Sequence, residues 1–300
     1  MNQPAISVIV PFYNAAATLG ATLTSLAASS CRDIEVLLID DASTDTAPDL
    51  ARAQVSQDAR FRYLHNPTNR GVSFSRNRGL DEACGQWVAF VDADDWISSD
   101  WLANLLADAA TSRAEVVIGR TRRIRDGGEE DYPMQGLRHR GALAFADIVF
   151  KDNSVVWNKL YAAALIRRDR LRFDDSLWIG EDLLFNFSAL HAAQGLFYGA
   201  QGHYHHRADN ETSIMRSSSA PDRVANFSRL LHLLKVAAES VGLPRHPALR
   251  KVARDLLMDH YRYHTPPPDD TTLGLIRQIS PTLPLRVRAS VWRKSLRARF

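Results

Sequence analysis

Four short strand-like runs in the first hundred residues alternate with stretches of helical composition. The runs occupy residues 6–10, 35–39, 61–65 and 87–91, and the stretches between them occupy 15–28, 47–57 and 73–84. Runs that are apolar and rich in β-branched residues indicate strands buried on both faces of a parallel sheet. We therefore predict successive strand–helix units with right-handed crossovers, which complete a nucleotide-binding half-domain by Asp95. Pro11 is expected to end the first strand.

Three carboxylates, Asp92, Asp94 and Asp95, directly follow the fourth run. Open α/β sheets bind their ligands at the carboxyl ends of such strands. Asp92 and Asp94 are two residues apart, so in an extended segment both side chains leave the same face and can share one divalent cation. The alternative is an ordinary Asp-rich turn in which Asp95 caps a helix that begins near Ser98.

Residues beyond the first two runs are suited to hold a nucleotide. Tyr13 offers a ring on which a base can stack, and Asn14 adds an amide. Asp41 can accept the N3–H of uracil. The alternative for Asp40, Asp41 and Ser43 is an Asx-type turn that caps the next helix.

Arg76 lies in the third predicted helix, after a turn that contains glycine. Together with Arg70 or Arg78 it can reach a diphosphate as a fork of donors. The alternative is that Arg76 belongs to a solvated helix face.

The composition is that of an ordinary globular chain. Of the 300 residues, 45% are hydrophobic and 24% are charged, and the net charge is +3, which argues against a nucleic-acid-binding protein. Cys31 and Cys84 are the only cysteines, so a disulfide framework is excluded and a reducing compartment is expected. We expect neither a signal peptide nor a membrane span, because no basic start leads into an apolar stretch and no long apolar run occurs.

The middle of the chain is harder to interpret. Residues 115–119 predict another strand, and the charged, glycine-containing stretch 120–140 predicts a loop or excursion from the domain. Glu181 and Asp182 precede a predicted helix at 183–193, where two acids also suit the helix dipole. Catalysis and helix capping both stay open for this pair.

A polar segment follows at Tyr204, His205, His206 and Arg207. A neutral imidazole can supply a third metal ligand, and Arg207 can pair with phosphate. The alternative is a set of exposed polar residues on a terminal strand and loop.

The character of the chain changes beyond Pro221. Apolar residues recur at helical spacing, and a triple proline at 266–268 separates these stretches from the end of the chain. We predict a helical region over residues 219–300 after a main domain over residues 1–218. Residues 285–300 are basic and amphipathic and carry no acid, so they suit either an anionic membrane surface or a packed helix with a solvated basic face.

Five segments carry a family resemblance. The series VIVPFYNAAATL, EVLLIDDASTD, NRGVSFSRNRGL, WVAFVDADDW and GEDLLFN, in this order, resembles the family 2 glycosyltransferases of the GT-A fold over roughly residues 5–215. The resemblance implies an α/β fold with a Rossmann-like mixed sheet flanked by helices, here with a C-terminal helical extension. It also implies an inverting transferase that uses a nucleotide sugar and a divalent cation, Mn²⁺ or Mg²⁺.

The resemblance also implies roles for particular residues. The nucleotide-sugar-binding positions are Pro11, Tyr13, Asn14, Asp41, Arg76, Asp92, Ala93 and Asp94, of which Arg76 lies at the diphosphate and Asp94 is the principal metal ligand. Asp92 and His206 complete the expected metal ligands. Asp182 falls on the general base, with Glu181 as its rival. Residues 155–161, which include Trp157, resemble a segment that borders the sugar or acceptor pocket in bacterial capsule and exopolysaccharide enzymes, although Trp157 suits the core equally.

We therefore expect a metal-dependent hexosyltransferase that moves a sugar, most simply from a UDP-sugar, to a saccharide or lipid-linked acceptor in cell-surface polysaccharide synthesis. Its expected location is the cytoplasm, at the inner face of the cell membrane. A non-catalytic nucleotide-sugar-binding protein would need neither Asp94 nor Asp182. A sugar nucleotidyltransferase would need a glycine-rich basic loop where this chain has Pro11 and Tyr13.

Overall fold

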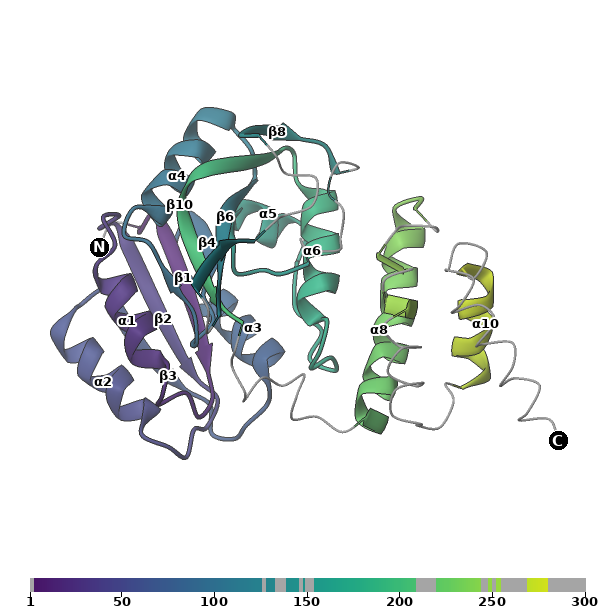
Figure 1. Cartoon of the computed structure of the whole chain (residues 1–300), viewed down its shortest axis with the longest axis horizontal. Helices are drawn as coiled ribbons and strands as arrows, with labels where there is room; N and C mark the ends of the chain where they lie inside the picture. The colour runs from purple at the N-terminus through teal and green to yellow at the C-terminus, as the bar shows by residue number, and fades with distance from the viewer. Residues whose placement is uncertain are drawn as a thin grey trace.

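The chain folds into one mixed sheet with helices on both faces, and further helices pack beside it (Figure 1). The computed structural model describes residues 3–125, 128–132, 139–145, 148, 154–208, 220–243, 248–249, 252–254 and 269–279. In these residues the strand order is β3-β2-β1-β4-β9-β6-β10-β5, with β7 paired to β6 and β8 paired to β10. The predicted α/β fold with a mixed sheet is confirmed.

The first third of the chain forms the parallel part of the sheet. Its elements are β1 (Ile6–Phe12), α1 (Leu19–Ala27), β2 (Ile34–Asp40), α2 (Ala47–Gln57), β3 (Phe61–His65), α3 (Val72–Glu82) and β4 (Trp87–Phe90). Strand β1 pairs in parallel with β2 on one side and with β4 on the other, and β2 pairs in parallel with β3. The carboxyl ends of these strands therefore meet at one edge of the sheet, as the strand–helix repeat predicts.

The next third adds strands of both directions. Its elements are β5 (Trp96–Ile97), α4 (Trp101–Ser112), β6 (Val116–Arg125), β7 (Gly128–Asp131), β8 (Gly141–Leu143), β9 (Lys159–Ala162), α5 (Ala163–Arg168), α6 (Glu181–Ala192) and β10 (Leu196–Arg207). Strand β9 runs antiparallel to both β4 and β6, and β10 runs parallel to β6. The late strand β10 thus lies between β6 and the terminal strand β5, and its end reaches the loop that follows β4.

Two apolar layers cover the two faces of the sheet. Val88 and Phe90 of β4 point into one layer, and Ala89 and Val91 point into the other, as the two-residue period of a strand requires. The first layer contains the apolar faces of α5, α6 and a later helix, α8 (Ala220–Ser240), and the second contains those of α1, α2 and α4. Burial on both faces explains why the strands read as nearly continuous apolar runs.

Strand β1 continues through Pro11 to Phe12, so the prediction that Pro11 ends it is wrong. Phe12 accepts a hydrogen bond from the Asp41 N–H on the β2 side. Alternation then turns the backbone nitrogen of Pro11 toward the β4 side, where the last paired residues are Ile9 and Phe90. A proline is tolerated there because no partner strand needs its N–H.

Three other expectations need correction. Residues 120–125 continue strand β6 and pair with β7, so the predicted loop over 120–140 is wrong in this part. Helix α1 begins at Leu19 rather than near residue 15. Helix α4 begins at Trp101 rather than near Ser98, and the Asp95 carboxylate binds residues of β10, so its predicted role as a helix cap is wrong.

Helix α8 (Ala220–Ser240) packs directly on α6, as Figure 1 shows. Gly180, at the start of α6, has φ +81°, and a Cβ there would lie 2.3 Å from Leu230 Cδ2 of α8. The Asn226 side chain of α8 also binds the Trp178 N–H at 3.0 Å and the Ile179 carbonyl at 2.7 Å. A helix is thus present where apolar residues recur at helical spacing beyond Pro221, and it packs tightly against the segment that carries Glu181.

Helix α10 (Asp270–Ile279) lies beyond α8, where Thr272 Oγ1 is 3.1 Å from His232 Nε2. The second predicted helix is described only at residues 248–249 and 252–254, and the basic tail at 285–300 lies outside the described residues. The division at residue 218 stays a prediction. Among the helices described, none combines the length and the apolar character that a membrane crossing needs.

Candidate active site

The predicted base pocket lies at the ends of β1 and β2. Pro11 is buried, whereas the Tyr13 side chain is 50% exposed and can receive a stacked base. Asn14, with φ 49°, accepts the Thr44 N–H at 2.8 Å and donates its own backbone N–H to Ser43 Oγ at 3.0 Å. These two bonds join the loop after β1 to the loop after β2 and fix the position of Tyr13.

Asp41 is buried at the end of β2 and organises the turn before α3. Its carboxylate accepts from Asn66 Nδ2 at 2.7 Å, from the Gly71 N–H at 2.7 Å and from the Arg70 N–H at 3.1 Å. Gly71 has φ +87°, a conformation that L side chains rarely adopt. The Arg70 N–H also lies 3.1 Å from the second oxygen, so these contacts use the roughly four acceptor positions of the carboxylate. Asp41 therefore has a structural role here, and its role in binding uracil stays a prediction.

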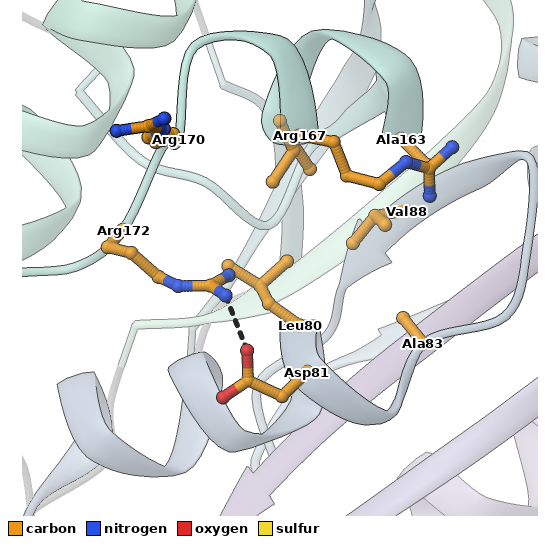
Figure 2. A pocket seen from close by; sticks show the side chains of 9 residues that line it. Leu80, Asp81, Ala83, Val88, Ala163, Arg167, Arg170 and Arg172 are labelled. Carbon is orange, nitrogen blue, oxygen red and sulfur yellow. Dashed lines mark hydrogen bonds and ion pairs between the residues drawn. The ribbon is translucent and has the colours of Figure 1, made fainter.

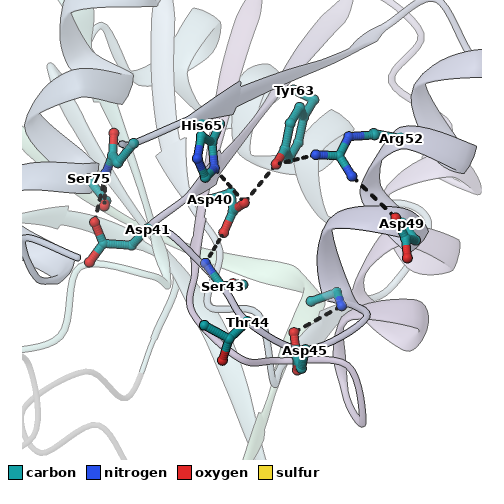
Figure 3. Close-up of polar contacts among 12 residues, drawn as sticks. Asp40, Asp41, Ser43, Thr44, Asp45, Asp49, Arg52, Tyr63, His65 and Ser75 are labelled. Atoms are coloured by element: carbon teal, nitrogen blue, oxygen red, sulfur yellow. Dashed lines mark hydrogen bonds and ion pairs between the residues drawn. The ribbon is translucent and has the colours of Figure 1, made fainter. Parts of the chain in front are cut away.

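Asp40, rather than Asp41, makes the Asx-type turn. Figure 3 shows Tyr63 and His65 converging on Asp40, and the Ser43 N–H is 2.8 Å from Asp40 Oδ1. Burial alone would raise the pKa of Asp40, but the hydrogen bonds from Tyr63, Ser43 and His65 outweigh it and leave this pKa lowered. Asp40 thus stays ionised as a structural anchor beside the base pocket.

The D-x-D segment forms the loop that follows β4. Asp92 and Asp94 are partly exposed, whereas Ala93 and Asp95 are buried. Asp95 accepts from Tyr204 Oη at 2.7 Å and from the Arg207 N–H at 2.8 Å, and Arg207 Nε donates to the Asp94 carbonyl at 3.2 Å. The end of β10 therefore holds this loop in place.

His206 lies behind the loop, with its ring stacked on Trp157 at 5.0 Å between centroids. Its Nδ1 is 3.4 Å from Asp95 Oδ2. Burial lowers the pKa of His206, but Asp95 and the two other aspartates raise it overall. Tyr204 is buried and Trp157 is 5% exposed, so the alternative of an exposed terminal loop is wrong for Tyr204, and Trp157 belongs to the core.

Arg76 connects the two acidic segments of the site. Its Nη2 donates to Asp92 Oδ1 at 3.0 Å, and its Nη1 donates to Glu181 Oε1 at 2.8 Å. Burial opposes the charged form, but Asp92, Glu181 and Asp182 raise the pKa of Arg76 overall. Arg76 is 5% exposed, so the alternative of a solvated helix face is wrong. A role at the diphosphate stays a prediction, because these carboxylates already hold the guanidinium.

Asp182 lies near Asp92 and Glu181 but, unlike them, accepts no hydrogen bond from Arg76 among the described contacts. It lies in the first turn of α6 and is partly exposed, and its Oδ1 accepts the Leu183 N–H at 2.7 Å. Burial and the charge of Glu181 raise its pKa to about 7, although Arg76 and the Leu183 N–H oppose this change. A carboxylate whose pKa lies near neutrality is well matched to remove a proton at neutral pH.

The arrangement also bears on which acid of the pair is the base. Glu181 is buried and ion-paired with Arg76, whereas Asp182 makes no ion pair of this kind among the contacts of the described residues. An ion-paired carboxylate is a weaker base because the guanidinium stabilises its charged form. The geometry therefore favours Asp182 over Glu181.

The expected cation would lie between Asp92 and Asp94. Among the described residues, no three His, Cys, Asp or Glu side chains converge as a complete metal site. Mg²⁺ and similar cations are commonly held by one or two carboxylates together with substrate phosphates. The two partly exposed carboxylates fit that pattern, and His206, whose Nδ1 already faces Asp95, has Nε2 as its remaining ligand atom.

Comparison with known proteins places the chain. Residues 7–172 match the model of the family described as glycosyl transferase family 2. The chain belongs to this family. The transferase is 30% identical over 225 residues to EpsH of Bacillus subtilis (strain 168), a protein named as a putative glycosyltransferase. This alignment covers 72% of this chain and 64% of EpsH. It is 29% identical over 205 residues to the succinoglycan biosynthesis protein ExoO of Rhizobium meliloti (strain 1021), covering 63% of this chain and 58% of ExoO. It thus spans a little under two thirds of these relatives.

Solved structures with the same fold support the architecture of the transferase. Residues 1–349 of S. aureus TarS in complex with UDP superpose with a TM-score of 0.70 at 21% identity, over 95% of this chain and 82% of that chain. The mannosyltransferase PcManGT of Pyrobaculum calidifontis, in complex with GDP-Man and Mn²⁺, gives a TM-score of 0.59 at 16% identity over 100% of this chain and 82% of that chain. At these identities the likeness establishes the fold.

A hollow on the transferase lies away from this site. Figure 2 shows it between α3, β4 and α5, with a volume of about 530 Å³. Its lining consists of Leu80, Asp81, Ala83, Val88, Ala163, Ile166, Arg167, Arg170 and Arg172. Val88 lies near the start of β4, whereas Asp92 follows its end. The hollow is therefore at the opposite edge of the sheet and is separate from the candidate active site.

Proposed function

We propose that this transferase is an inverting, metal-dependent enzyme that moves a sugar from a UDP-sugar to a saccharide or lipid-linked saccharide acceptor. The observation that carries the proposal is the junction of Asp92, Arg76, Glu181 and Asp182, which joins the loop after β4 to the start of α6. It sets a carboxylate with a pKa near neutrality beside the D-x-D loop.

Asp182 acts as the general base in this proposal. Its carboxylate takes the proton of the acceptor hydroxyl while that oxygen attacks the anomeric carbon. The new bond forms on the face opposite the bond to the nucleotide diphosphate, which breaks and leaves with its electron pair. Direct displacement of this kind inverts the anomeric configuration. Glu181 and Arg76 fix the first turn of α6, and the proposal requires that the partly exposed carboxylate of Asp182 reaches the acceptor hydroxyl.

The cation, Mn²⁺ or Mg²⁺, would be held by Asp94 and Asp92 together with oxygens of the donor diphosphate, because His206 does not complete a three-residue metal site with them. When bound, it supplies positive charge that stabilises the departing diphosphate. The Asp95 contacts to Tyr204 and Arg207 hold the loop so that its two exposed carboxylates stay together. The Mn²⁺ complex of PcManGT supports a cation of this type in the fold.

A uridine nucleotide is the preferred donor in the proposal. Tyr13 has the exposure needed for stacking, and the Asp41 carboxylate would have to exchange one of its backbone contacts, such as that with the Arg70 N–H, for the N3–H of uracil. TarS in complex with UDP supports this choice, and PcManGT in complex with GDP-Man shows that the fold also occurs with guanosine donors. Donor choice therefore has to be measured on this protein.

Cell-surface polysaccharide synthesis is the proposed setting, and the name of ExoO supports it. In this setting the transferase would work in the cytoplasm at the inner face of the membrane. A lipid-linked acceptor would suit a basic segment such as residues 285–300, which can bind an anionic surface.

A donor screen tests the proposal directly. The purified protein is incubated with UDP-, GDP- and ADP-sugars, with and without Mn²⁺, and the release of nucleotide diphosphate is measured. We expect release from a UDP-sugar that a chelator abolishes, and NMR of the product should show an inverted anomeric centre. Asp49→Asn serves as a matched control, because Asp49 is an exposed carboxylate on α2 that pairs only with Arg52 in the described contacts. Chelator-insensitive release, or a retained configuration, would reject the proposal.

A further inference from the structure

Lys159 is a fully buried lysine that the proposed reaction does not use. It is 0% exposed at the start of β9, where it pairs with Ile118 of β6. Its Nζ donates to the Val155 carbonyl at 2.6 Å and to Asn158 Oδ1 at 2.8 Å. A buried ammonium group is costly unless charge and hydrogen bonds compensate it. An apolar side chain at this position would therefore avoid the desolvation free energy that the lysine costs.

The surroundings of Lys159 point toward the start of α6. Lys159 and Tyr161 leave the same face of β9, and Asp182 and Asn186 leave the same face of α6. Tyr161 Oη donates to Asn186 Oδ1 at 2.6 Å, and Asn186 Nδ2 donates to the Val155 carbonyl at 2.7 Å. These bonds show that the two faces are turned toward each other. Lys159 therefore lies on the face of β9 that is turned toward the face of α6 carrying Asp182.

Electrostatics agree with this geometry. Burial lowers the pKa of Lys159 to about 7, and the charge of Asp182 opposes that change. Burial raises the pKa of Tyr161 well above its ordinary value, and Asp182 again adds to the shift. The charge of Asp182 therefore raises the pKa of both Lys159 and Tyr161.

We propose that Lys159 is a positioning residue for Asp182, whose buried ammonium group orients the base and favours its ionised form during transfer. The proposal rests on Asp182 as the general base. The charged groups that face Asp182 are Glu181 on α6, Arg76 on α3, Asp92 after β4 and Lys159 on β9. Without Lys159, the guanidinium of Arg76 is the cation left to compensate three carboxylates in this group.

A double-mutant cycle tests the contact without any knowledge of the acceptor. Lys159→Met, Asp182→Asn and the double variant are unfolded in urea at pH 7 and at pH 4. At pH 7, Lys159→Met should raise the unfolding constant at least fivefold more in the parent than in the Asp182→Asn background, a difference of about 1 kcal/mol. At pH 4 the difference should vanish, because Asp182 is protonated. Coupling that is absent at pH 7, or equal at both pH values, overturns the proposal.

Tyr161→Phe is the matched control. It removes a buried hydrogen bond from the same face of β9 and changes no charge at neutral pH. It should destabilise the protein equally with and without Asp182→Asn. If Lys159→Met does not fold, the double variant decides: recovery of folding on removal of Asp182 supports the proposal, and failure of both overturns it.

The pH profile of turnover separates positioning from structure. Hydrolysis of the donor, with water in place of the acceptor, is measured from pH 5 to pH 9. Lys159→Met should move the acidic limb of kcat upward by about half a pH unit with little change in the donor KM, and Lys159→Arg should restore it. An unmoved limb contradicts the proposal. Full turnover in Asp182→Asn alone instead contradicts the base assignment, so the two failures are distinguishable.

Discussion

Asp182→Asn is predicted to abolish transfer and to stabilise the fold. The amide keeps the shape of the side chain but cannot take the acceptor proton, so kcat should fall about 10²–10⁴-fold, or roughly 3–5 kcal/mol of barrier. The donor KM should change little, because Asp182 faces the acceptor in the proposed reaction. The loss of turnover follows from the missing proton acceptor, and the gain of stability follows from removal of a carboxylate whose charged form the fold disfavours.

The size of the stabilisation follows from the pKa of Asp182. Its ordinary value of 3.8 is raised to about 7 in the folded protein, so the fold binds this proton more tightly than the unfolded chain does. The proton's contribution to stability is fully present below pH 3.8 and is lost as the pH rises through 7. At about 1.4 kcal/mol for each pH unit, the ionised carboxylate costs the fold up to about 4 kcal/mol at pH 8 and less than half of that at pH 5.

The assay compares Tm for the parent and Asp182→Asn at the two pH values. The advantage of the variant should be larger at pH 8 than at pH 5 by about 2–3 kcal/mol, or roughly 5 °C. Glu181→Gln is the control, since it breaks the 2.8 Å pair with buried Arg76 and should lower Tm at both pH values. An advantage that does not grow with pH refutes the raised pKa, and normal turnover in folded Asp182→Asn refutes the base.

Three further predictions concern the donor, the cation and the membrane. Asp94→Asn should weaken Mn²⁺ binding at least about tenfold by calorimetry and remove most turnover, with Asp49→Asn unchanged, and equal Mn²⁺ affinity would count against the metal role. Asp41→Ala should narrow a preference for UDP over GDP and cost about 1–3 kcal/mol of stability, because the Arg70 and Gly71 N–H groups lose their acceptor. Equal affinities of the parent for both nucleotides would exclude the uracil role. Removal of residues 285–300 should abolish sedimentation with anionic vesicles at low salt, and binding that survives both truncation and high salt would rule out the tail.

The alternating part of the fold was accessible from the sequence. The bounds of α2 and β3 agree with the predicted ranges, because each element lies between clear turn residues and has its own pattern. The sequence indicates only the polar segment at 204–207 in this region, whereas strand β10 runs from Leu196 to Arg207. A strand that carries histidines and glycines lacks the apolar signal, and its place in the sheet is set by contacts with β6 that are distant in the sequence.

The sequence predicts which residues belong to the candidate site, but it does not predict how their side chains contact one another. Asp41, Asp92 and Asp182 follow strands or start a helix, and such positions can be read from local pattern. The bond from Arg76 to Glu181 spans 105 residues and has no local signal. Lys159 was missed as a charged residue of interest, because burial of a lysine cannot be seen in the sequence. Its neighbours Trp157 and Tyr161, both aromatic, were the only hint of a core position.

The hydrogen bonds between Asp95 and β10 also affect the order in which parts of the chain can fold. Asp95 and Tyr204 are 109 residues apart, so the bond between them can form only after most of the chain has been synthesised. During translation the parallel strands can fold first, since they are consecutive, while the loop that carries Asp92 and Asp94 still lacks this support. If these carboxylates hold the cation as we propose, a nascent chain that ends before Leu196 should bind a nucleotide without cleaving the sugar from it.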